Sequence, residues 1–114
     1  MLQPLLLPHF KKQLKKLLKK YPRLRDSLVL TLQEFHKEHA IHLGKNVYKL
    51  RVQSKKDLSK RKSGSFRLIV LLLEVEEFLV PVTIYFKGDT VDISKEEITG
   101  HLEMILWELR HVDV

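Results

Sequence analysis

The stretch from residue 65 to residue 86, SFRLIVLLLEVEEFLVPVTIYF, decides the fold of this chain. Its first half is an almost uninterrupted apolar run, which is typical of a strand buried on both faces. Glu76 and Glu77 make a turn, and a second apolar strand follows. Pro81 has no backbone N–H, so we expect a β-bulge or an edge position there. The stretch predicts a β-hairpin at the centre of a sheet.

A third strand is expected before this hairpin, because side chains from residue 46 to residue 53 alternate between apolar and polar. A period of two indicates one face in the core and one face in water. Lys49 and Arg51 fall on the wet face.

Helical spacing marks both ends of the chain. Apolar residues recur every three or four positions from Phe10 to Tyr21, and Pro22 ends that helix. A second helix is expected from about Leu24 to His39, with Gly44 in the loop that follows, and the short connection predicts an antiparallel pair. Ser94 and Glu97 form a capping box, which opens the last helix.

The whole pattern predicts an α+β fold: an N-terminal antiparallel helix pair, a twisted, mainly antiparallel sheet of 3–4 strands and a C-terminal helix. A length of 114 residues, 44% of them hydrophobic, fits one domain spanning residues 1–114.

Charge points to an anionic partner. The chain has 21 Lys and Arg against 14 Asp and Glu, a net charge of +7. Residues 1–73 hold 18 basic and 4 acidic side chains (+14), and residues 74–114 hold 3 basic and 10 acidic ones (−7). The lysines of the first helix fit a phosphate backbone, an anionic membrane or a plain solvent-facing side, and we favour the last.

Several classes of protein are excluded. The absence of cysteine rules out disulfide frameworks, Cys-type zinc sites and thiol nucleophiles. No phosphate-binding glycine loop, nucleophile elbow or paired-carboxylate motif occurs. His36, His39 and His42 are spaced by three but lack a carboxylate to complete a ligand set, so we expect no metal and no cofactor. No apolar run or leader pattern indicates a membrane span or a signal peptide, which predicts a cytoplasmic protein.

The candidate site is a cluster of cations. Nine cations and a single acid, Asp57, lie between Lys45 and Arg67. Arg67 interrupts an apolar strand, so it either reaches a carboxylate or receives an anion. Lys87 ends the Pro81 strand and would approach Arg67 if the two strands are hairpin neighbours. The alternative for the strand lysines is protection of an exposed edge against aggregation.

The order of several segments resembles the RelE/HigB branch of the RelE/ParE toxin superfamily, the toxins of bacterial type II toxin–antitoxin modules. The segments are HFKKQLKKLLKKYPRL, GKNVYKLRVQS, KRKSGSFRLIV and VTIYFKGDTVDISKEEI, and the resemblance covers about residues 9–109. It implies a ribosome-dependent endoribonuclease that cuts mRNA and is held inactive by a cognate antitoxin protein, in a toxin–antitoxin hetero-oligomer.

The resemblance also implies roles for individual residues. Lys49 or Arg51 would act in proton transfer and substrate positioning, Arg67 on the scissile phosphate, and Lys87 in auxiliary charge stabilisation. The residues expected to bind the RNA backbone are Lys55, Lys56, Lys60, Arg61 and Lys62. RNA supplies its own nucleophile, the 2′-hydroxyl, so such a site needs no metal.

The chain departs from the family pattern at three positions. Ser65 and Phe66 stand where relatives often have glycine and tyrosine, and Ile93 stands where some have a catalytic or base-stacking tyrosine. Tyr85 replaces that phenol only if it faces the cations, which strand parity alone does not decide.

Two other functions remain open. One is a ParE-like inhibitor of DNA gyrase, which would not need the cluster of Lys49, Arg51 and Arg67. The other is a non-catalytic basic module that binds RNA or ribosomes, with salt-sensitive affinity and no cleavage.

Overall fold

The computed structural model describes residues 1–52, 66–87 and 92–111, and the predicted hairpin lies at its centre. Strands β4 (Phe66–Leu73) and β5 (Phe78–Phe86) pair antiparallel. Residues 68 to 72 of β4 are at most 6% exposed, so neighbouring side chains are buried although they point to opposite faces. The prediction of a strand buried on both faces is confirmed.

Three further strands complete a sheet in the order β1-β5-β4-β3-β2. Strand β3 (Val47–Arg51) pairs antiparallel with β4, β2 (Ile41–Gly44) pairs antiparallel with β3, and β1 (Gln3–Pro4) pairs parallel with β5. The described sheet therefore has five strands rather than the expected 3–4.

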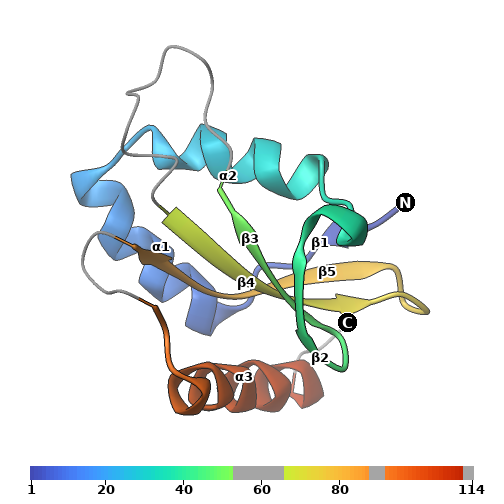
Figure 1. Cartoon of the computed structure of the whole chain (residues 1–114). Coiled ribbons are helices and arrows are strands. Elements are labelled where there is room, and N and C mark those ends of the chain that lie inside the picture. Colours follow the sequence, from blue (N-terminus) through green and yellow to red (C-terminus); the bar gives the residue numbers. More distant parts are fainter. Residues whose placement is uncertain (53–65, 88–91, 112–114) are drawn as a thin grey trace.

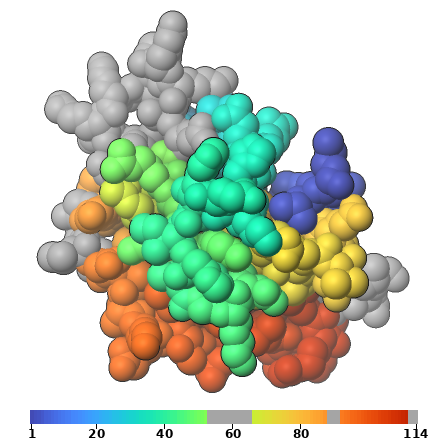
Figure 2. Space-filling view, turned by 45° about the vertical axis from the view of Figure 1, so that its right-hand side comes forward, coloured from blue at the N-terminus to red at the C-terminus, as the bar shows by residue number. Residues whose placement is uncertain are grey.

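The two strands beyond the expected number, β1 and β2, lie at the edges of the sheet. Their side chains are exposed, so no hydrophobic pattern marks them in the sequence. Strand β1 has two residues, and every residue of β2 is exposed. Gly44, expected in a loop, ends β2 with a φ of 132°, a backbone conformation that suits glycine. Figure 2 shows the green segment that contains β2 lying across the surface of the molecule.

Helices cover the sheet on both sides (Figure 1). Helices α1 (Pro8–Lys20) and α2 (Leu24–Gln33) form the expected N-terminal pair, and α3 (Lys95–Arg110) lies on the opposite side of the sheet. Tyr21, at the end of α1, packs its ring on Phe66 and Phe86, with centroids 5.2 and 5.9 Å apart. On α3, Ile105 is fully buried. None of the helices within the described residues is long and apolar enough to span a bilayer.

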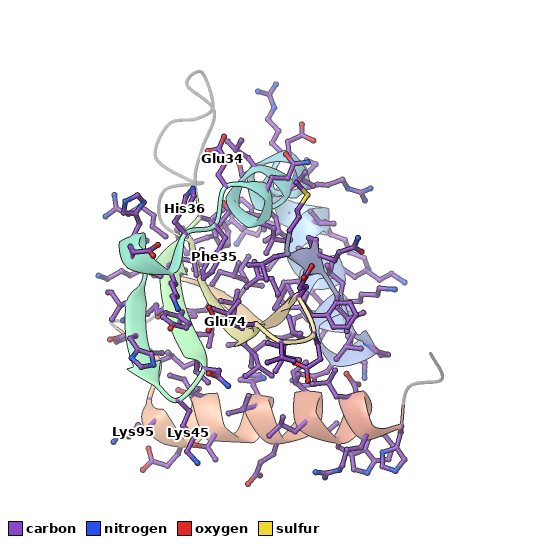
Figure 3. All side chains as sticks on the ribbon, turned by 90° about the vertical axis from the view of Figure 1, so that its right-hand side faces the viewer. Glu34, Phe35, His36, Lys45, Glu74 and Lys95 are labelled. Atoms are coloured by element: carbon purple, nitrogen blue, oxygen red, sulfur yellow. The ribbon has the colours of Figure 1, made fainter. Side chains whose placement is uncertain are left out.

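The second helix ends earlier than expected. It stops at Gln33 instead of His39, and a separate 3-10 turn, η1, spans Lys37–His39. Between them the chain is extended at His36, and the ring of Phe35 lies 6.1 Å from that of Tyr48 on β3. Figure 3 shows Phe35 pointing toward the sheet, while Glu34 and His36 point away from it. The half-buried ring of Phe35 therefore packs on a strand that is distant along the sequence.

The capping box at the start of α3 is confirmed. The Ser94 hydroxyl accepts from the backbone N–H of Glu97 at 3.1 Å, and the Glu97 carboxylate accepts from the backbone N–H of Ser94 at 3.2 Å. Helix α3 therefore begins at Lys95, directly after the extended Ser94.

A bulge in β5 is closed by a side chain from α1. Ile69 lies opposite Thr83 and Val70 opposite Pro81, which leaves Val82 as the extra residue and confirms the bulge. Gln13 donates to the carbonyl of Val82 at 3.2 Å and accepts from the hydroxyl of Thr83 at 2.5 Å. Thr83 is only 2% exposed, so this contact satisfies a buried hydroxyl.

Replacing Gln13 with leucine is expected to lower the free energy of unfolding by about 1–3 kcal/mol, because the buried Thr83 hydroxyl loses its partner. Urea titration measures the change. The double variant Gln13→Leu/Thr83→Val removes both polar groups and should recover much of the loss. A double variant no more stable than Gln13→Leu would contradict this account.

A histidine pair joins α1 to α3. His9 Nε2 lies 2.8 Å from His101 Nδ1, and the Glu108 carboxylate accepts from the backbone N–H of His9 at 3.0 Å. Burial and the charge of His9 lower the pKa of His101, while Glu97 acts in the opposite direction. This contact therefore favours an uncharged His101.

The stability of the fold should consequently depend on His101 below neutral pH. The unfolded chain takes up this proton near pH 6.5, whereas the folded chain does so only at lower pH, so the free energy of unfolding falls as the pH drops through 6.5. In urea titrations, the free energy of unfolding should fall less between about pH 7.5 and about pH 5.5 in His101→Gln than in the wild type. His111→Gln is the control, and equal losses in all three proteins would disprove the assignment.

Candidate functional site

Three neighbouring strands bring Arg51, Arg67 and Tyr85 into one row. In the register, Arg51 lies directly opposite Arg67, and Arg67 lies directly opposite Tyr85. Directly opposite residues share a face of the sheet. The next row holds Phe66 and Phe86, which face the helix pair, so the row with the arginines faces the other side.

The row lies where α3 begins. Strand β3 ends at Arg51, β4 begins at Phe66 and β5 ends at Phe86, so the same end of the sheet carries all three residues of the row. The chain that leads into α3 passes this end of the sheet (Figure 1). Helix α3 starts at Lys95, three residues after Asp92.

The two arginines differ in exposure. Arg51 is exposed and Arg67 is half-buried, with its Nη1 donating to the carbonyl of Phe66 at 3.3 Å. Guanidinium groups bind phosphate oxygens through several N–H donors, so this pair has the chemistry to receive an anion.

Lys49 and Tyr85 converge on a carboxylate beside the row. Lys49 Nζ lies 3.4 Å from both carboxylate oxygens of Asp92, and the Tyr85 hydroxyl donates to Oδ1 of the same residue at 2.9 Å. The Lys49 side chain is only 19% exposed, while that of Asp92 is 57% exposed. The Lys49 ammonium on β3 and the Tyr85 hydroxyl on β5 thus both contact the Asp92 carboxylate, which lies close to the surface.

The surroundings of Asp92 lower its pKa, and those of Tyr85 raise its pKa. The backbone N–H of Ile93, the Tyr85 hydroxyl and Lys49 lower the pKa of Asp92. Burial, followed by the hydrogen bond to Asp92 and its negative charge, raises the pKa of Tyr85 to about 12, against the opposing charge of Arg67. At neutral pH Asp92 is therefore a carboxylate and Tyr85 a protonated phenol, which is able to donate a proton.

The structure brings together part of the predicted cluster. Lys49 and Arg51 share one face, as the alternation of β3 predicted, and the register of β3 with β4 places Arg67 on the same face. Lys87 is exposed and directly follows β5, one residue beyond the last pair of the hairpin. The β4–β5 hairpin is confirmed, and its register places Tyr85 rather than Lys87 opposite Arg67.

The predicted RNA-binding residues lie outside the described part of the chain. They are Lys55, Lys56, Lys60, Arg61 and Lys62. The described chain stops at Val52 and resumes at Phe66, which are the neighbours of Arg51 and Arg67.

Two residues of the site were not predicted. Asp92 carried no signal, because it precedes the capping box of α3 in a segment without periodicity. Tyr85 was considered but not assigned, and the bulge at Val82 explains why. In a regular strand Pro81 and Thr83 share a face, but here they pair with the adjacent residues Val70 and Ile69 and so face opposite ways. Tyr85 follows Thr83 and joins the arginines.

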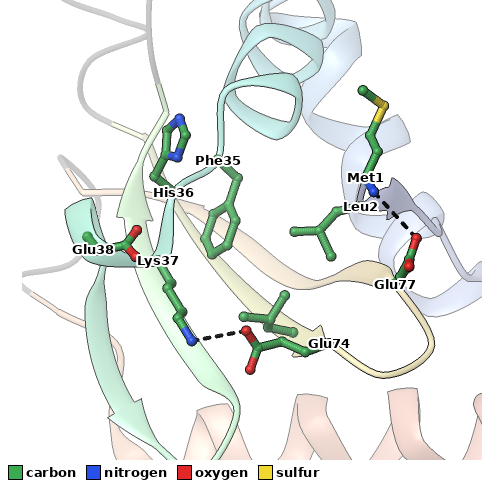
Figure 4. Close-up of a pocket in the computed structure, with 9 residues that line it drawn as sticks. Met1, Leu2, Phe35, His36, Lys37, Glu38, Glu74 and Glu77 are labelled. Carbon is green, nitrogen blue, oxygen red and sulfur yellow. Dashed lines mark hydrogen bonds and ion pairs between the residues drawn. The ribbon is translucent and has the colours of Figure 1, made fainter.

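Other hollows on the surface have different chemistry. The pocket in Figure 4, of about 340 Å³, includes Lys37 ion-paired with Glu74 at 3.0 Å and the terminal amine of Met1 bound to Glu77 at 3.4 Å. The terminal amine and Lys37 are each paired with a carboxylate, and Glu38 also lines the pocket, so it does not favour an anion. Within the described residues no three His, Asp or Glu side chains gather as metal ligands. His42, for example, stacks on Tyr48 instead of joining His36 and His39.

The contact between Tyr85 and Asp92 makes a spectroscopic prediction. With a pKa of about 12, Tyr85 should be about one tenth ionised at pH 11, where a free tyrosine is about nine tenths ionised. The difference in tyrosinate absorbance between the wild type and Tyr85→Phe isolates this residue from Tyr21 and Tyr48. Asp92→Ala removes the hydrogen bond and the charge and should lower the pKa of Tyr85 toward 10. No change in Asp92→Ala, with the fold intact by circular dichroism, would refute the contact.

Comparison with known proteins assigns no family. No protein-family model matches the chain, and no curated protein matches its sequence.

Proposed function

We propose that this protein is the toxin component of a type II toxin–antitoxin module and acts as a metal-independent endoribonuclease that cuts mRNA on the ribosome. The observation that carries the proposal is the row Arg51–Arg67–Tyr85, with Lys49 beside it, on one face at one end of the sheet. These side chains have the chemistry that cleavage of RNA by its own 2′-hydroxyl requires. The resemblance of the chain's segments to RelE/HigB-like toxins agrees with it.

In the proposed reaction the 2′-oxygen attacks the adjacent phosphorus and the bond from phosphorus to the 5′-oxygen breaks. The products are a 2′,3′-cyclic phosphate and a 5′-hydroxyl, so one proton leaves the nucleophile and one reaches the leaving oxygen. Arg67 and Arg51 would bind the non-bridging oxygens and stabilise the extra negative charge that develops on them. No redox step or metal is required by this balance.

The proton transfers would be divided between Lys49 and Tyr85. A guanidinium does not lose its proton in proteins, so Arg51 would position substrate. Lys49 would accept the proton of the 2′-hydroxyl as a neutral amine, so its ammonium must first lose a proton and leave its ion pair with Asp92. Tyr85, protonated at neutral pH, would supply the proton to the 5′-oxygen. Lys87 would add charge at the margin, and the cations from Lys55 to Lys62 would bind the RNA backbone.

Replacing Arg67 with alanine should slow cleavage of ribosome-bound mRNA about a hundredfold, corresponding to about 3 kcal/mol, because one preorganised donor to the phosphate is lost. Mapping of mRNA 5′ ends after addition of purified protein measures the rate. Arg110→Ala, at the exposed end of α3, is the matched control and should cleave at the wild-type rate. A folded Arg67→Ala protein with wild-type activity would overturn the assignment.

Expression of the wild type in cells, followed by mapping of mRNA 5′ ends, separates the other two functions. Growth arrest on expression of the wild type without new mRNA 5′ ends would favour inhibition of gyrase. Salt-sensitive binding of RNA or ribosomes, with neither new ends nor growth arrest, would indicate a non-catalytic basic module.

A further inference from the structure

A pocket at the outer edge of β3 is not used by the proposed reaction. It lies between the end of α2, the turn η1 and the end of β3, and has a volume of about 240 Å³. Pockets for drug-sized ligands measure about 300–1,000 Å³, so this one suits a single flat ring system rather than a peptide. The lining residues that carry the argument are Glu34, Phe35, His36, His39, Leu50 and Arg51.

The pocket lies where β3 extends past its neighbour. Strand β2 pairs with β3 only as far as Lys49, so Leu50 and Arg51 have no strand beside them on this edge. The backbone N–H of Val52 donates to the carbonyl of Phe66 at 3.0 Å, toward β4. Backbone groups of adjacent strand residues point in opposite directions, so those of Arg51 point away from β4, toward the pocket.

This outward-facing backbone is open to a ligand. Within the described part of the chain, the N–H and the carbonyl of Arg51 have no backbone partner. A donor and an acceptor thus stand in the wall of the pocket, as at any unpaired strand edge.

The rest of the lining combines aromatic rings with one carboxylate. The rings of His36 and His39 are exposed, with centroids 5.7 Å apart, while Phe35 and Leu50 are half-buried. A flat aromatic ligand can stack on an imidazole and pack against the apolar side chains. Figure 3 shows Glu34 and His36 on the same side of the chain. Among the described residues, no cation lies within ion-pair distance of the Glu34 carboxylate.

We propose that this pocket binds the base of a guanine nucleotide. The Glu34 carboxylate would accept from the N1–H and the 2-amino group of guanine, and the backbone N–H of Arg51 would donate to O6. One of the two imidazole rings would stack on the base. The guanidinium of Arg51 would bind the phosphate of the same nucleotide.

The other bases match this lining less well. Guanine has two adjacent N–H donors beside a carbonyl oxygen, which complement two carboxylate oxygens and a neighbouring N–H. Adenine and cytosine each turn a ring nitrogen that is an acceptor toward the carboxylate, and uracil offers only one donor there. A site built to hydrogen-bond a ligand rejects an analogue that leaves its polar groups without partners.

Arg51 belongs both to this pocket and to the row with Arg67 and Tyr85. A free guanine nucleotide bound here would therefore compete with RNA for one of the arginines. A guanosine within an RNA strand has the same chemistry, and in that case the pocket would place a guanine next to the cleaved bond. This second source rests on the proposed function, whereas the first does not.

The test measures binding of the 5′-monophosphates of guanosine, adenosine, cytidine and uridine by isothermal titration calorimetry at about 150 mM salt. The wild type should bind guanosine monophosphate at least about tenfold more tightly than the other three. Equal affinity for all four would show that only the phosphate is bound, and would overturn the inference.

Glu34→Gln and Glu38→Gln form a matched pair of variants. Both residues are exposed and each substitution removes one negative charge, but Glu38 lines the neighbouring pocket and not this one. Glu34→Gln should weaken binding of guanosine monophosphate about tenfold and leave that of adenosine monophosphate unchanged, while Glu38→Gln should alter either by less than about twofold. Thermal melting verifies that both variants are folded. Equal effects of the two substitutions would reveal an unspecific charge effect and contradict the assignment.

Two short oligouridylates, one with a single central guanosine and one with a central adenosine, distinguish the sources. Tighter binding of the guanosine oligonucleotide than of both the other strand and the mononucleotide assigns the pocket to RNA. Equal binding of the two strands, with the preference for guanosine monophosphate retained, assigns it to a free nucleotide. Since no assay involves cleavage, that preference in a protein that does not cut mRNA would support the pocket and refute the nuclease, and cleavage without it would do the reverse.

Discussion

The β4–β5 hairpin must be covered on both faces, and the rest of the structure depends on this constraint. Leu68 and Ile69 are adjacent and point to opposite sides, yet both are fully buried. One layer of helices cannot bury them both. The chain therefore places α1 and α2 against one side of the sheet and α3 against the other, and the two layers meet through His9 and His101. Among the described residues, Arg51 is exposed at the end of β3, and Arg67 beside it is half-buried.

The candidate site is a consequence of this incomplete cover. Helix α3 begins at Lys95, because Ser94 is extended and caps the helix through its capping box with Glu97. Asp92 is consequently left at the open end of the sheet, in contact with Lys49 and Tyr85. Polar groups are stable here because they are only partly removed from water, yet close enough to shift each other's pKa values. The same conditions are those in which a charged substrate can be bound and acted on.

Local signals predicted those elements whose formation depends on nearby residues. The apolar run of β4 required burial, the alternation of β3 placed Lys49 and Arg51 on one face, and Ser94 with Glu97 defined the start of α3. The sequence did not predict the elements whose limits depend on contacts between residues far apart along the chain. The second helix stops at Gln33 because Phe35 packs on Tyr48, and β1 forms only because β5 offers it an edge. Neither contact has a trace in the adjacent sequence.

By itself, the sequence determined the fold class, the buried hairpin and the separation of charge into a basic part and an acidic part, because hydrophobic period and composition are local properties. The tertiary structure decided which charges meet. The bulge at Val82 turns Tyr85 toward Arg67, and the path into α3 brings Asp92 to Lys49. It also brought Glu34 and His36 into one pocket with Arg51. These juxtapositions depend on strand register and helix position, which follow from the packing of the whole chain and not from any one segment.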